Sequence, residues 1–374
     1  MRLGALIVVP LAIAAALTAW SVTAAHRGTA PGGFSDSSAR ESRTLTGPHA
    51  TSRRRDAIRR AHLRLEEPIL SAADAFPDDA HATVECRFLT RPAEGTSAKF
   101  DCILASGNVI KVKYGRNPEI HAETAATRLL ARLGYATDRM AIVDRVRCYG
   151  CPRFPFATMQ LLQFVGLDSL LEPHGYDAGY TEFALVSIEH RFPAPAIETD
   201  TMKGWGWFEL KDSGADRAEV DALRLLAVFL AHWDNKSENQ RLVCLDRQLR
   251  TTDDVCRNPL LMVQDLGSTF GPAKVNLGTW TTLPLWRDAR SCLVSMRDLP
   301  FHGGTFPDAH ISEAGRRQLL TGLDALSTGE IRHLFDGAGF PIFQSTTDDN
   351  RDLDAWTSAF QSRVDAIRAA GPCP

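Results

Sequence analysis

The sequence has no excess of charge of either sign. Its 42 Lys and Arg residues nearly balance its 45 Asp and Glu residues, and the net charge of −3 gives no basic surface of the kind that binds nucleic acid. Otherwise the composition is that of an ordinary globular protein, with 44% hydrophobic and 23% charged residues. A chain of 374 residues is long enough for one large domain or two ordinary ones. We therefore expect a globular protein with no nucleic-acid partner.

The chain also lacks a second CxxC pair. Cys148 and Cys151 form "CYGC", and without another pair to complete four zinc ligands a local disulfide is the favoured interpretation. A redox-active CxxC is less favoured, because no thioredoxin-like βαβ pattern surrounds it. The eight cysteines fit an oxidising compartment. Their spacing suggests four pairs, although sequence does not fix the connectivity: Cys86 with Cys102, Cys148 with Cys151, Cys244 with Cys256, and Cys292 with Cys373.

The N-terminal segment differs from the rest. Residues 1–25 contain an apolar run after one early positive charge, and small residues follow near Ala24, which is typical of a secretory signal peptide. The run is also long enough for an uncleaved membrane anchor. Residues 26–80 are expected to be a linker, disordered from His26 to about Asp56 and with a short helix near 58–70. We therefore expect an exported protein, either periplasmic, extracellular or anchored on the outer side, with membrane contact only through this segment.

Residues 81–165 are expected to form a small antiparallel sheet with one helix. "TVECRFL", "AKFDCIL" and "VIKVKYG" alternate as strands and are separated by turns, which predicts a three-strand meander. "NPEIHAETAATRLLARLGY" has helical spacing, with Pro118 near its start and Gly134 at its end. The apolar segments "RMAIVDRV" and "FATMQLLQF" are both short enough to be strands.

Residues 166–374 are expected to be mostly helical. The segment from Ala215 to His232 is apolar on most sides, which indicates a buried helix. Two short strands, "QRLVCL" and "PLLMVQDLG", follow it. A capping box at Ser327 and Glu330 predicts a helix start, and an amphipathic helix closes the chain. The pattern predicts an α+β fold. "KGWGWFELKD" lies just before the buried helix, and its two tryptophans are expected to pack over the lower lobe, with a substrate shelf or a lipid-facing edge as the alternatives.

The loop after the buried helix carries a dense group of polar residues. "HWDNKSEN", residues 232–239, has the form H-x-D-x-K-x-x-N and lies between that helix and a strand. It resembles the catalytic loop of the protein kinases, and Asp265-Leu266-Gly267 at the end of the second strand resembles their D-F-G segment. In the first half, "NVIK" resembles the V-A-I-K strand, and Glu123 lies in the helix that follows. The resemblance covers about residues 82–277.

The resemblance implies a two-lobed protein kinase-like fold and a set of roles. Phosphoryl transfer requires positioning and charge neutralisation. Asp234 would orient the accepting hydroxyl and Lys236 would offset charge on the transferred group. Asn239 and Asp265 would hold Mg²⁺ or Mn²⁺.

The upper lobe would bind the phosphates of ATP through a lysine that is held by Glu123. Lys111 and Lys113 lie on one face of their strand, and we favour Lys111 because Val109 would then line the adenine pocket. "AEGTSAKF" stands in the place of the glycine-rich loop without being G-x-G-x-x-G. Ser97 and backbone amides of that segment are its candidate phosphate contacts.

Three departures favour an atypical branch. Trp233 replaces the usual arginine, a long insertion separates Asn239 from Asp265, and no A-P-E segment follows. Such features resemble the HipA-like bacterial kinases, the Golgi casein kinase type of secretory kinase and the small-molecule phosphotransferases. We expect an exported ATP-dependent phosphotransferase acting on a hydroxyl of a protein, sugar or lipid. The alternative is an exported pseudokinase-like binding or scaffold protein.

Overall fold

The computed structural model describes most of the chain from residue 43 onwards. The described residues are 43–65, 82–92, 95–166, 179–246, 255–271, 275–300, 305–306, 308–342 and 348–374. The expected signal peptide or anchor at 1–25 lies outside them. Among these residues, no helix is long and apolar enough to span a membrane.

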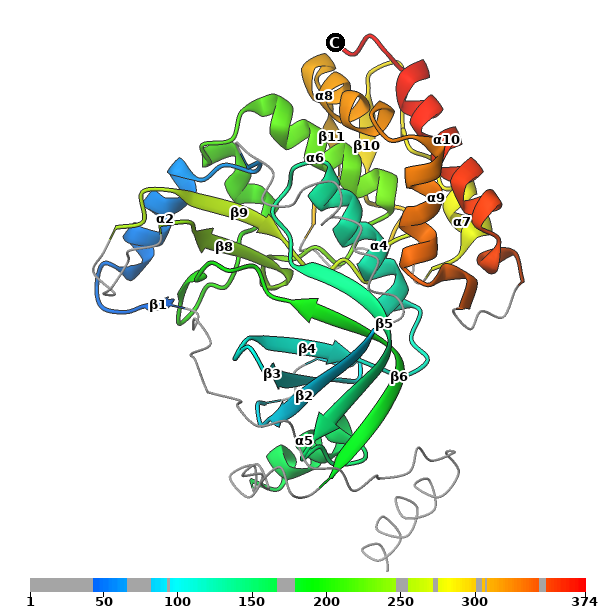
Figure 1. Cartoon of the computed structure of the whole chain (residues 1–374). Helices are drawn as coiled ribbons and strands as arrows, with labels where there is room; N and C mark the ends of the chain where they lie inside the picture. Colours follow the sequence, from blue (N-terminus) through cyan, green and yellow to red (C-terminus); the bar gives the residue numbers. More distant parts are fainter. Residues whose placement is uncertain are drawn as a thin grey trace, which may run out of the picture.

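Alternating apolar residues build the upper lobe as a closed barrel. Its strands are β2 (Thr83–Leu89), β3 (Lys99–Leu104), β4 (Val109–Lys113), β5 (Arg139–Tyr149) and β6 (Tyr180–His190). They pair in the order β2-β3-β4-β6-β5, and β5 closes the barrel by pairing in parallel with β2. The expected three-strand meander is confirmed, because β2–β3 and β3–β4 are antiparallel. Figure 1 shows the barrel below a larger group of helices.

The helix predicted after the third strand is α4 (Glu119–Arg132). Most of its side chains are buried, because it packs against β5 on one side and against the helix α9 of the other lobe. It ends at Gly134, whose φ of +87° is a backbone conformation that favours glycine. α4 therefore connects the barrel mechanically to the lower lobe.

One expected strand is a helix. "FATMQLLQF" lies within α5 (Pro155–Phe164) and not in a strand. Pro155 occupies the first helical turn, where its missing N–H costs nothing, and Phe156 and Met159 are buried with a helical spacing of three. A short apolar run does not distinguish the two structures by periodicity, and here the proline and the contact of α5 with β3 favour the helix.

The lower lobe is mostly helical. Its helices are α6 (Arg217–Leu230), α7 (Leu277–Thr282), α8 (Glu313–Asp324), α9 (Thr328–Gly337) and α10 (Leu353–Ala369). Two hairpins accompany them, β8 (Gln240–Cys244) with β9 (Pro259–Val263) and β10 (Leu293–Ser295) with β11 (Asp308–His310). Short 3-10 helices are η4 (Trp207–Asp212), η5 (Ser237–Asn239), η6 (Phe340–Ile342) and η7 (Asp348–Arg351). The predicted buried helix, the two strands after it, the capping box and the terminal helix are all confirmed.

The lower-lobe core is built from aromatic side chains in mutual contact. Phe270 lies at its centre, with ring centroids 5.2–6.0 Å from four neighbouring aromatic rings. Those neighbours are Trp280, Phe335, Phe340 and Trp356. All five side chains are fully buried. Edge-to-face contacts of this kind add about 0.5–1.5 kcal/mol per pair beyond area burial.

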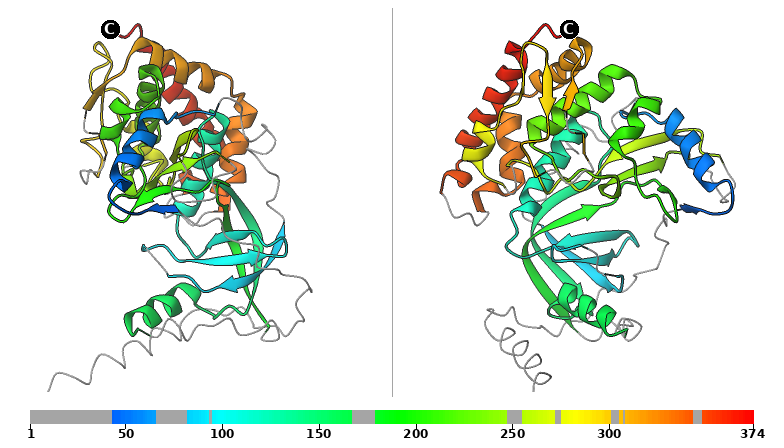
Figure 2. Two further views of the ribbon diagram at one scale, coloured as in Figure 1. Left: turned by 90° about the vertical axis from the view of Figure 1, so that its left-hand side faces the viewer. Right: turned by 180° about the vertical axis from the view of Figure 1, so that it is seen from behind.

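The segment expected to be a disordered linker is partly folded. β1 (Arg43–Leu45) pairs in parallel with β7 (Ile197–Thr199), and α2 (Ala50–Arg60) follows it. Arg54 of α2 is buried and forms a bidentate ion pair with Glu209 at 2.7 and 2.9 Å, so this segment is anchored to the lower lobe. The views in Figure 2 show α2 beside the lower-lobe hairpin of β8 and β9. The buried positions of this basic segment were not recognised from the sequence, because one of them, Arg54, is itself a charged residue.

The boundary between the lobes also differs from the expected residue 165. β6 pairs with β4 and β5, so the upper lobe continues to His190. Local patterns do not predict this pairing, because β5 and β6 are far apart in the sequence, with α5 between them.

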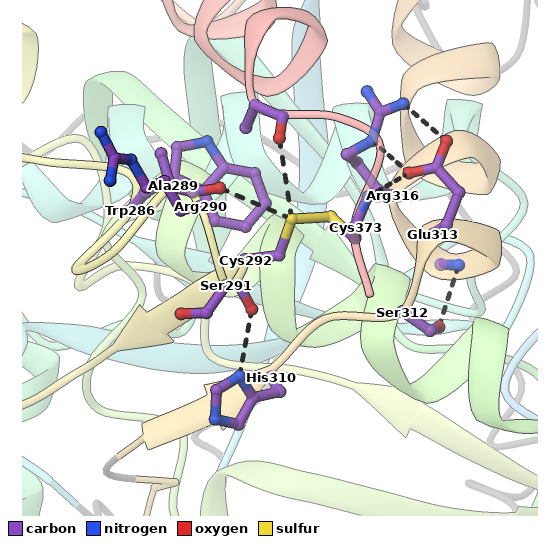
Figure 3. The surroundings of a disulfide bond; sticks show 12 residues. Trp286, Ala289, Arg290, Ser291, Cys292, His310, Ser312, Glu313, Arg316 and Cys373 are labelled. Carbon is purple, nitrogen blue, oxygen red and sulfur yellow. Dashed lines mark hydrogen bonds and ion pairs between the residues drawn. A yellow bond between two sulfur atoms is a disulfide. The ribbon is translucent and has the colours of Figure 1, made fainter.

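All eight cysteines form disulfides in the four suggested pairs. They are Cys86–Cys102, Cys148–Cys151, Cys244–Cys256 and Cys292–Cys373. The Cys244–Cys256 bridge closes the base of the insertion between Asn239 and Asp265, as predicted. Figure 3 shows Cys292–Cys373, which ties the end of the chain to the lower lobe, where the Cys373 amide also donates to Glu313 at 2.9 Å.

Candidate functional site

The loop at 232–239 has a fixed backbone. α6 ends at Leu230, and Ala231 adopts a left-handed conformation that turns the chain out of the helix. Asn239 then donates from its Nδ2 to the carbonyl of Asp234 at 2.8 Å, which closes the loop across five residues. This bond leaves the Oδ1 of Asn239 as the atom that can accept or ligate.

Asp234 and Lys236 lie close together in this loop. The Nζ of Lys236 is 3.3 Å from the Oδ1 of Asp234. The carboxylate of Asp234 is half-buried, whereas Lys236 is exposed. The pair therefore presents a carboxylate and a cation side by side at the edge of the loop.

Asp265 follows β9 and is joined to the same loop by a histidine. The Nε2–H of His232 donates to the carbonyl of Asp265 at 3.3 Å. Burial lowers the pKa of His232 to about 4, against the raising effect of Asp265 and Asp234, so the imidazole is neutral near pH 7. Asp265 itself has a positive φ of 54° and an exposed side chain. A non-glycine residue in this conformation is strained, and such strain is concentrated at functional sites.

The segment "KGWGW" supports the loop from behind. Trp207 donates from Nε1 to the Oδ1 of Asn235 at 2.8 Å, and the Nδ2 of Asn235 donates to the His232 carbonyl at 2.6 Å. Gly204 lies so close that a Cβ there would be 1.9 Å from the carbonyl oxygen of Ser237. The two tryptophans are buried, which confirms the packing interpretation. The role of Gly204 was not predicted from the sequence, because the pattern around it does not show which segment packs against this glycine.

The predicted Lys111–Glu123 ion pair is wrong. Glu123 is bound by Lys113, whose Nζ lies 2.5 Å from the carboxylate, and both side chains are buried. Strand alternation correctly placed the two lysines on one face. Lys111, however, lies directly opposite Glu189 of β6 in the sheet register, and its Nζ is 2.6 Å from that carboxylate. Only Lys113, two residues further along β4, reaches α4.

Glu189 is a site residue that the sequence did not reveal. It is buried and accepts from both lysines, at 2.6 Å from Lys111 and 3.3 Å from Lys113. Burial would raise the pKa of Glu189, but the two lysine cations outweigh that effect and hold the pKa well below its ordinary value. Burial would likewise lower the pKa of Lys113, and the carboxylates of Glu123 and Glu189 outweigh it and raise that pKa.

Lys99 is a second residue that sequence reasoning missed. It lies opposite Lys113 in the β3–β4 register. Its pKa is lowered, because burial and the cations of Lys111 and Lys113 outweigh the attraction of Asp265 and Glu189. An anion that binds beside Lys99 would stabilise the charged form of this lysine. The turn between β3 and β4 would have indicated this position, because pairing across that hairpin sets Lys99 opposite Lys113.

Ser97 lies in the segment that replaces the glycine-rich loop. Its Oγ donates to the Oε2 of Glu119 at 2.7 Å and accepts from the Nδ2 of Asn117 at 3.1 Å. Glu119 begins α4 and packs beside Gly267, where an added Cβ would be 3.3 Å from the Cβ of Glu119. The hydroxyl of Ser97 is thus bound to the N-terminal end of α4, next to the Asp-Leu-Gly segment.

The lobes meet at a second set of hydrogen bonds. Asp138, just before β5, accepts from the amide of Phe192 at 2.7 Å and from the Nε2 of Gln264 at 2.8 Å. Phe192 lies two residues after β6, and Gln264 immediately precedes Asp265. Asp138 therefore fixes the connection between the lobes relative to the acidic end of β9.

The donor set suits a metal ion that is shared with a ligand. Asp265 offers an exposed carboxylate and Asn239 an amide oxygen, both of which are hard oxygen ligands of the kind that Mg²⁺ and Mn²⁺ take. Mg²⁺ sites commonly use one or two protein oxygens, with waters and phosphate oxygens filling the rest of the octahedron. Among the described residues, the groups of three close His, Cys, Asp or Glu side chains contain cysteine in every case and do not include these two. The residues thus fit a metal that arrives with a nucleotide, and not a dedicated protein cage.

No family model matches the sequence, and no curated protein matches it either. Similar solved structures include that of CtkA, a proinflammatory kinase of Helicobacter pylori, which is 10% identical and aligns over 78% of this chain and 98% of its own, with a TM-score of 0.42. Two structures of the Golgi casein kinase, one of them with Mn and ADP bound, are each 11% identical over 80% of this chain. The alignments cover 75% and 74% of the two Golgi casein kinase chains, and the TM-scores are 0.35 and 0.38.

Because these TM-scores are below 0.5, the fold assignment rests on the chain itself. A β lobe with one helix precedes a mostly helical lobe, a buried lysine–glutamate pair joins β4 to α4, and the loop after the buried helix precedes a strand pair that ends in Asp-Leu-Gly. This is the two-lobed, kinase-like α+β fold.

Proposed function

We propose that this chain is an exported ATP-dependent phosphotransferase that acts on a hydroxyl of a protein, sugar or lipid. The observation that carries the proposal is the buried Lys113–Glu123 pair, whose electrostatic neighbours include Asp265. Burying an ion pair costs several kcal/mol of desolvation per ion, and apolar side chains of similar volume would stabilise the fold at least as well. A chain that keeps Lys113, Glu123 and Glu189 buried at the junction of its lobes gains little stability from them, which supports a role in binding.

The nucleotide lysine in this proposal is Lys113, not Lys111. Lys113 is oriented by Glu123 and is positioned to meet the phosphates of ATP, and Lys99 supplies a second cation beside it. Ser97 and the backbone of its segment cover the phosphates from above. Asp265 and Asn239 hold Mg²⁺ or Mn²⁺, and the metal supplies charge neutralisation on the phosphate oxygens.

The acceptor is oriented by the loop at 232–239. Asp234 receives the hydroxyl hydrogen bond of the acceptor, and Lys236 offsets charge on the group in transfer. The neutral, buried His232 does not take part as a base, since its bond to the Asp265 carbonyl gives it a positioning role. Asn239 donates to the carbonyl of Asp234 and so fixes the backbone that carries this carboxylate.

Export is supported by the cysteines. All eight form disulfides, and such a complement is typical of oxidising compartments. The signal peptide or anchor expected at residues 1–25 is a separate proposal that rests on the sequence.

The test compares nucleotide binding and turnover in three variants of the full chain. With ATP and Mg²⁺ or Mn²⁺ at 100 times Kd, the parent protein should be stabilised against thermal unfolding by about 2.7 kcal/mol. Asp265→Ala should lose metal-dependent binding. Asp234→Ala should bind ATP like the parent and lose about 10²–10⁴ in phosphate transfer, and Asn239→Ala should fall between them.

The acceptor class is measured separately, with protein, sugar and lipid hydroxyls offered to the parent and to Asp234→Ala. ATP binding without transfer to any acceptor, together with equal binding in all three variants, would support the alternative of a pseudokinase-like scaffold. No effect of ATP and metal on the melting of the parent protein would contradict the proposal as a whole.

A further inference from the structure

Glu189 joins two lysines that lie on one face of the neighbouring strand. Its Oε1 is 2.6 Å from the Nζ of Lys111, and its Oε2 is 3.3 Å from the Nζ of Lys113. The bridge follows from the sheet register, because Glu189 of β6 lies directly opposite Lys111 of β4, and Lys113 is the next residue on that strand face. Each oxygen of this buried carboxylate therefore contacts a different cation.

Lys113 is held by carboxylates from two different elements. Glu123 of α4 contacts its Nζ through both oxygens at 2.5 Å, and Glu189 of β6 contacts it through one oxygen. The ammonium of a lysine sits on a flexible four-carbon side chain, so a single partner leaves it several positions. Two partners on separate elements restrict the ammonium of Lys113 to the place where both contacts are made.

A second carboxylate is unfavourable, by its charge alone, in a site for phosphates. Glu189 interacts electrostatically with Lys99 as well as with Lys113, so its negative charge is felt by both of the cations assigned to the phosphates. The lysines hold the pKa of Glu189 well below its ordinary value, and the carboxylate is therefore ionised at neutral pH. Lys111 compensates this charge, because its ammonium is bonded directly to Glu189.

Strand pairing alone does not require these charges. The opposite face of β4 carries Ile110 and Val112, which pack in the apolar core of the barrel. Replacing a buried ion pair by apolar side chains of similar volume is often neutral or stabilising. The charges of Lys111 and Glu189 thus call for an explanation other than the stability of the sheet.

We propose that Glu189 is a positioning residue for the nucleotide lysine and that Lys111 is its counterion. Glu189 and Glu123 together fix the ammonium of Lys113 for the phosphates, and Lys111 compensates the charge that Glu189 brings to the site. This inference rests on the proposed function, because it assigns roles to two more residues of the same ATP site. It gives Lys111 a role that involves no contact with a phosphate.

The two residues have opposite effects on ATP affinity. Lys111→Met leaves the charge of Glu189 without its counterion, so ATP with Mg²⁺ should bind up to about tenfold more weakly. Glu189→Gln keeps the shape of the side chain and removes its charge, so ATP should bind at least as tightly as in the parent. Turnover of Glu189→Gln should nevertheless fall by about tenfold to a hundredfold, because Lys113 loses one of its two charged partners.

The double variant Lys111→Met/Glu189→Gln removes both charges together. Its ATP affinity should return to within about twofold of the parent, because the pair adds no net charge. Its turnover should stay as low as that of Glu189→Gln, because Lys113 is still held from one side. A role in folding alone would lower the stability of each single variant, but it would not move ATP affinity and turnover in different directions.

The experiment compares the parent and the three variants as full chains. Calorimetry gives the Kd of ATP with Mg²⁺, release of inorganic phosphate at saturating ATP gives the turnover with water as acceptor, and urea unfolding reports stability. Weaker ATP binding in Glu189→Gln than in Lys111→Met, or equal turnover in Glu189→Gln and an active parent, would overturn the inference. If the parent binds ATP but releases no phosphate, the affinities decide, and additive weakening in the double variant rejects the compensation.

Failure of this inference can be distinguished from failure of the proposed function. A parent protein that does not bind ATP with Mg²⁺ contradicts the proposed function, whereas a parent that binds ATP with the wrong order of variants rejects only the roles of Glu189 and Lys111. If Glu189→Gln does not fold, the double variant carries the test, because it removes both charges of the Lys111–Glu189 pair. Parent-like affinity with reduced turnover then supports the inference, and a loss of affinity as large as that of Lys111→Met overturns it.

Discussion

The two lobes satisfy buried charge in different ways. In the upper lobe, Lys113 is paired with the carboxylates of Glu123 and Glu189. In the lower lobe, the buried guanidinium of Arg363 on α10 donates to four backbone carbonyls. They belong to Val228, Phe229, Trp280 and Leu283.

This difference distinguishes Lys113, the charge that we propose binds the nucleotide, from Arg363, a charge that stabilises the fold. Arg363 donates to the carbonyls of Val228 and Phe229 at the end of α6, which also accept from the Ala231 amide and from the Trp280 Nε1, and it stacks on Phe229 and Trp280. Burial alone lowers the pKa of Arg363 to about 10, so it remains charged at neutral pH. The ammonium of Lys113, in contrast, has three donors and can bind a phosphate beside the Glu123 carboxylate. We therefore expect substitutions in the upper lobe to change turnover and those in the lower lobe to change stability.

The largest expected effect is in the upper lobe. Lys113→Met should lower phosphate transfer by about 10²–10⁴, because it removes the cation that we propose binds the phosphates. Lys111→Met is the matched control on the same strand face, and it should cost about tenfold or less because Lys111 is paired with Glu189 and not with Glu123. Turnover and ATP affinity of the two variants are measured side by side. A greater loss in Lys111→Met would restore the assignment made from the sequence.

The corresponding change in the lower lobe should act on stability. Arg363→Met removes the buried charged donor of four carbonyls, and breaking such a network costs about 3–5 kcal/mol. Urea unfolding gives the free energy difference. Arg332→Met is the control, because its ion pair with Asp354 is exposed and is worth less than about 1 kcal/mol. Equal stability of the two variants would contradict the structural role of Arg363.

His232 links the loop to Asp265 and predicts a pH dependence of stability. Its pKa of about 4 in the folded state is below the ordinary value of 6.5, so between these pH values the unfolded chain binds a proton that the folded chain does not. The contribution is present above about pH 6.5 and is lost as the pH falls to 4, and it amounts to about 3 kcal/mol. Urea unfolding at pH 7 and pH 4.5 should show a steeper loss for the parent than for His232→Gln. Parallel curves for the two proteins would mean that His232 titrates normally.

The smallest expected effect concerns the support of the loop. Trp207→Phe keeps the aromatic packing but removes the donor to Asn235, which should cost about 1–2 kcal/mol of stability. The transfer rate should fall by about tenfold, because the Asp234 backbone loses part of its support. Trp205→Phe, which loses the bond to the Met262 carbonyl instead, serves as the comparison. Its stability should fall by a similar amount while the ATP affinity stays unchanged.

The sequence by itself determined the features that depend on local order. The strand meander, the buried helix α6, the loop at 232–239 and the Asp-Leu-Gly segment follow from alternation, helical periodicity and spacing along the chain. The suggested cysteine pairs were also correct, three of them because close sequence neighbours had been paired. Local patterns predict these features because the contacts that define them lie within one element or between elements that are adjacent in the chain.

The tertiary structure decided how residues that look equivalent in the sequence are paired with partners far away in the chain. Alternation places Lys111 and Lys113 on one strand face. Only the positions of β6 and α4 determine that Lys111 pairs with Glu189 and Lys113 with Glu123. In the same way, the parallel closure of the barrel brings Cys102 and Cys148 into contact, although each is bonded to another cysteine. Such choices depend on distances across elements that are far apart in the chain, and those distances are fixed by packing of the whole lobe and leave no periodic signal in the sequence.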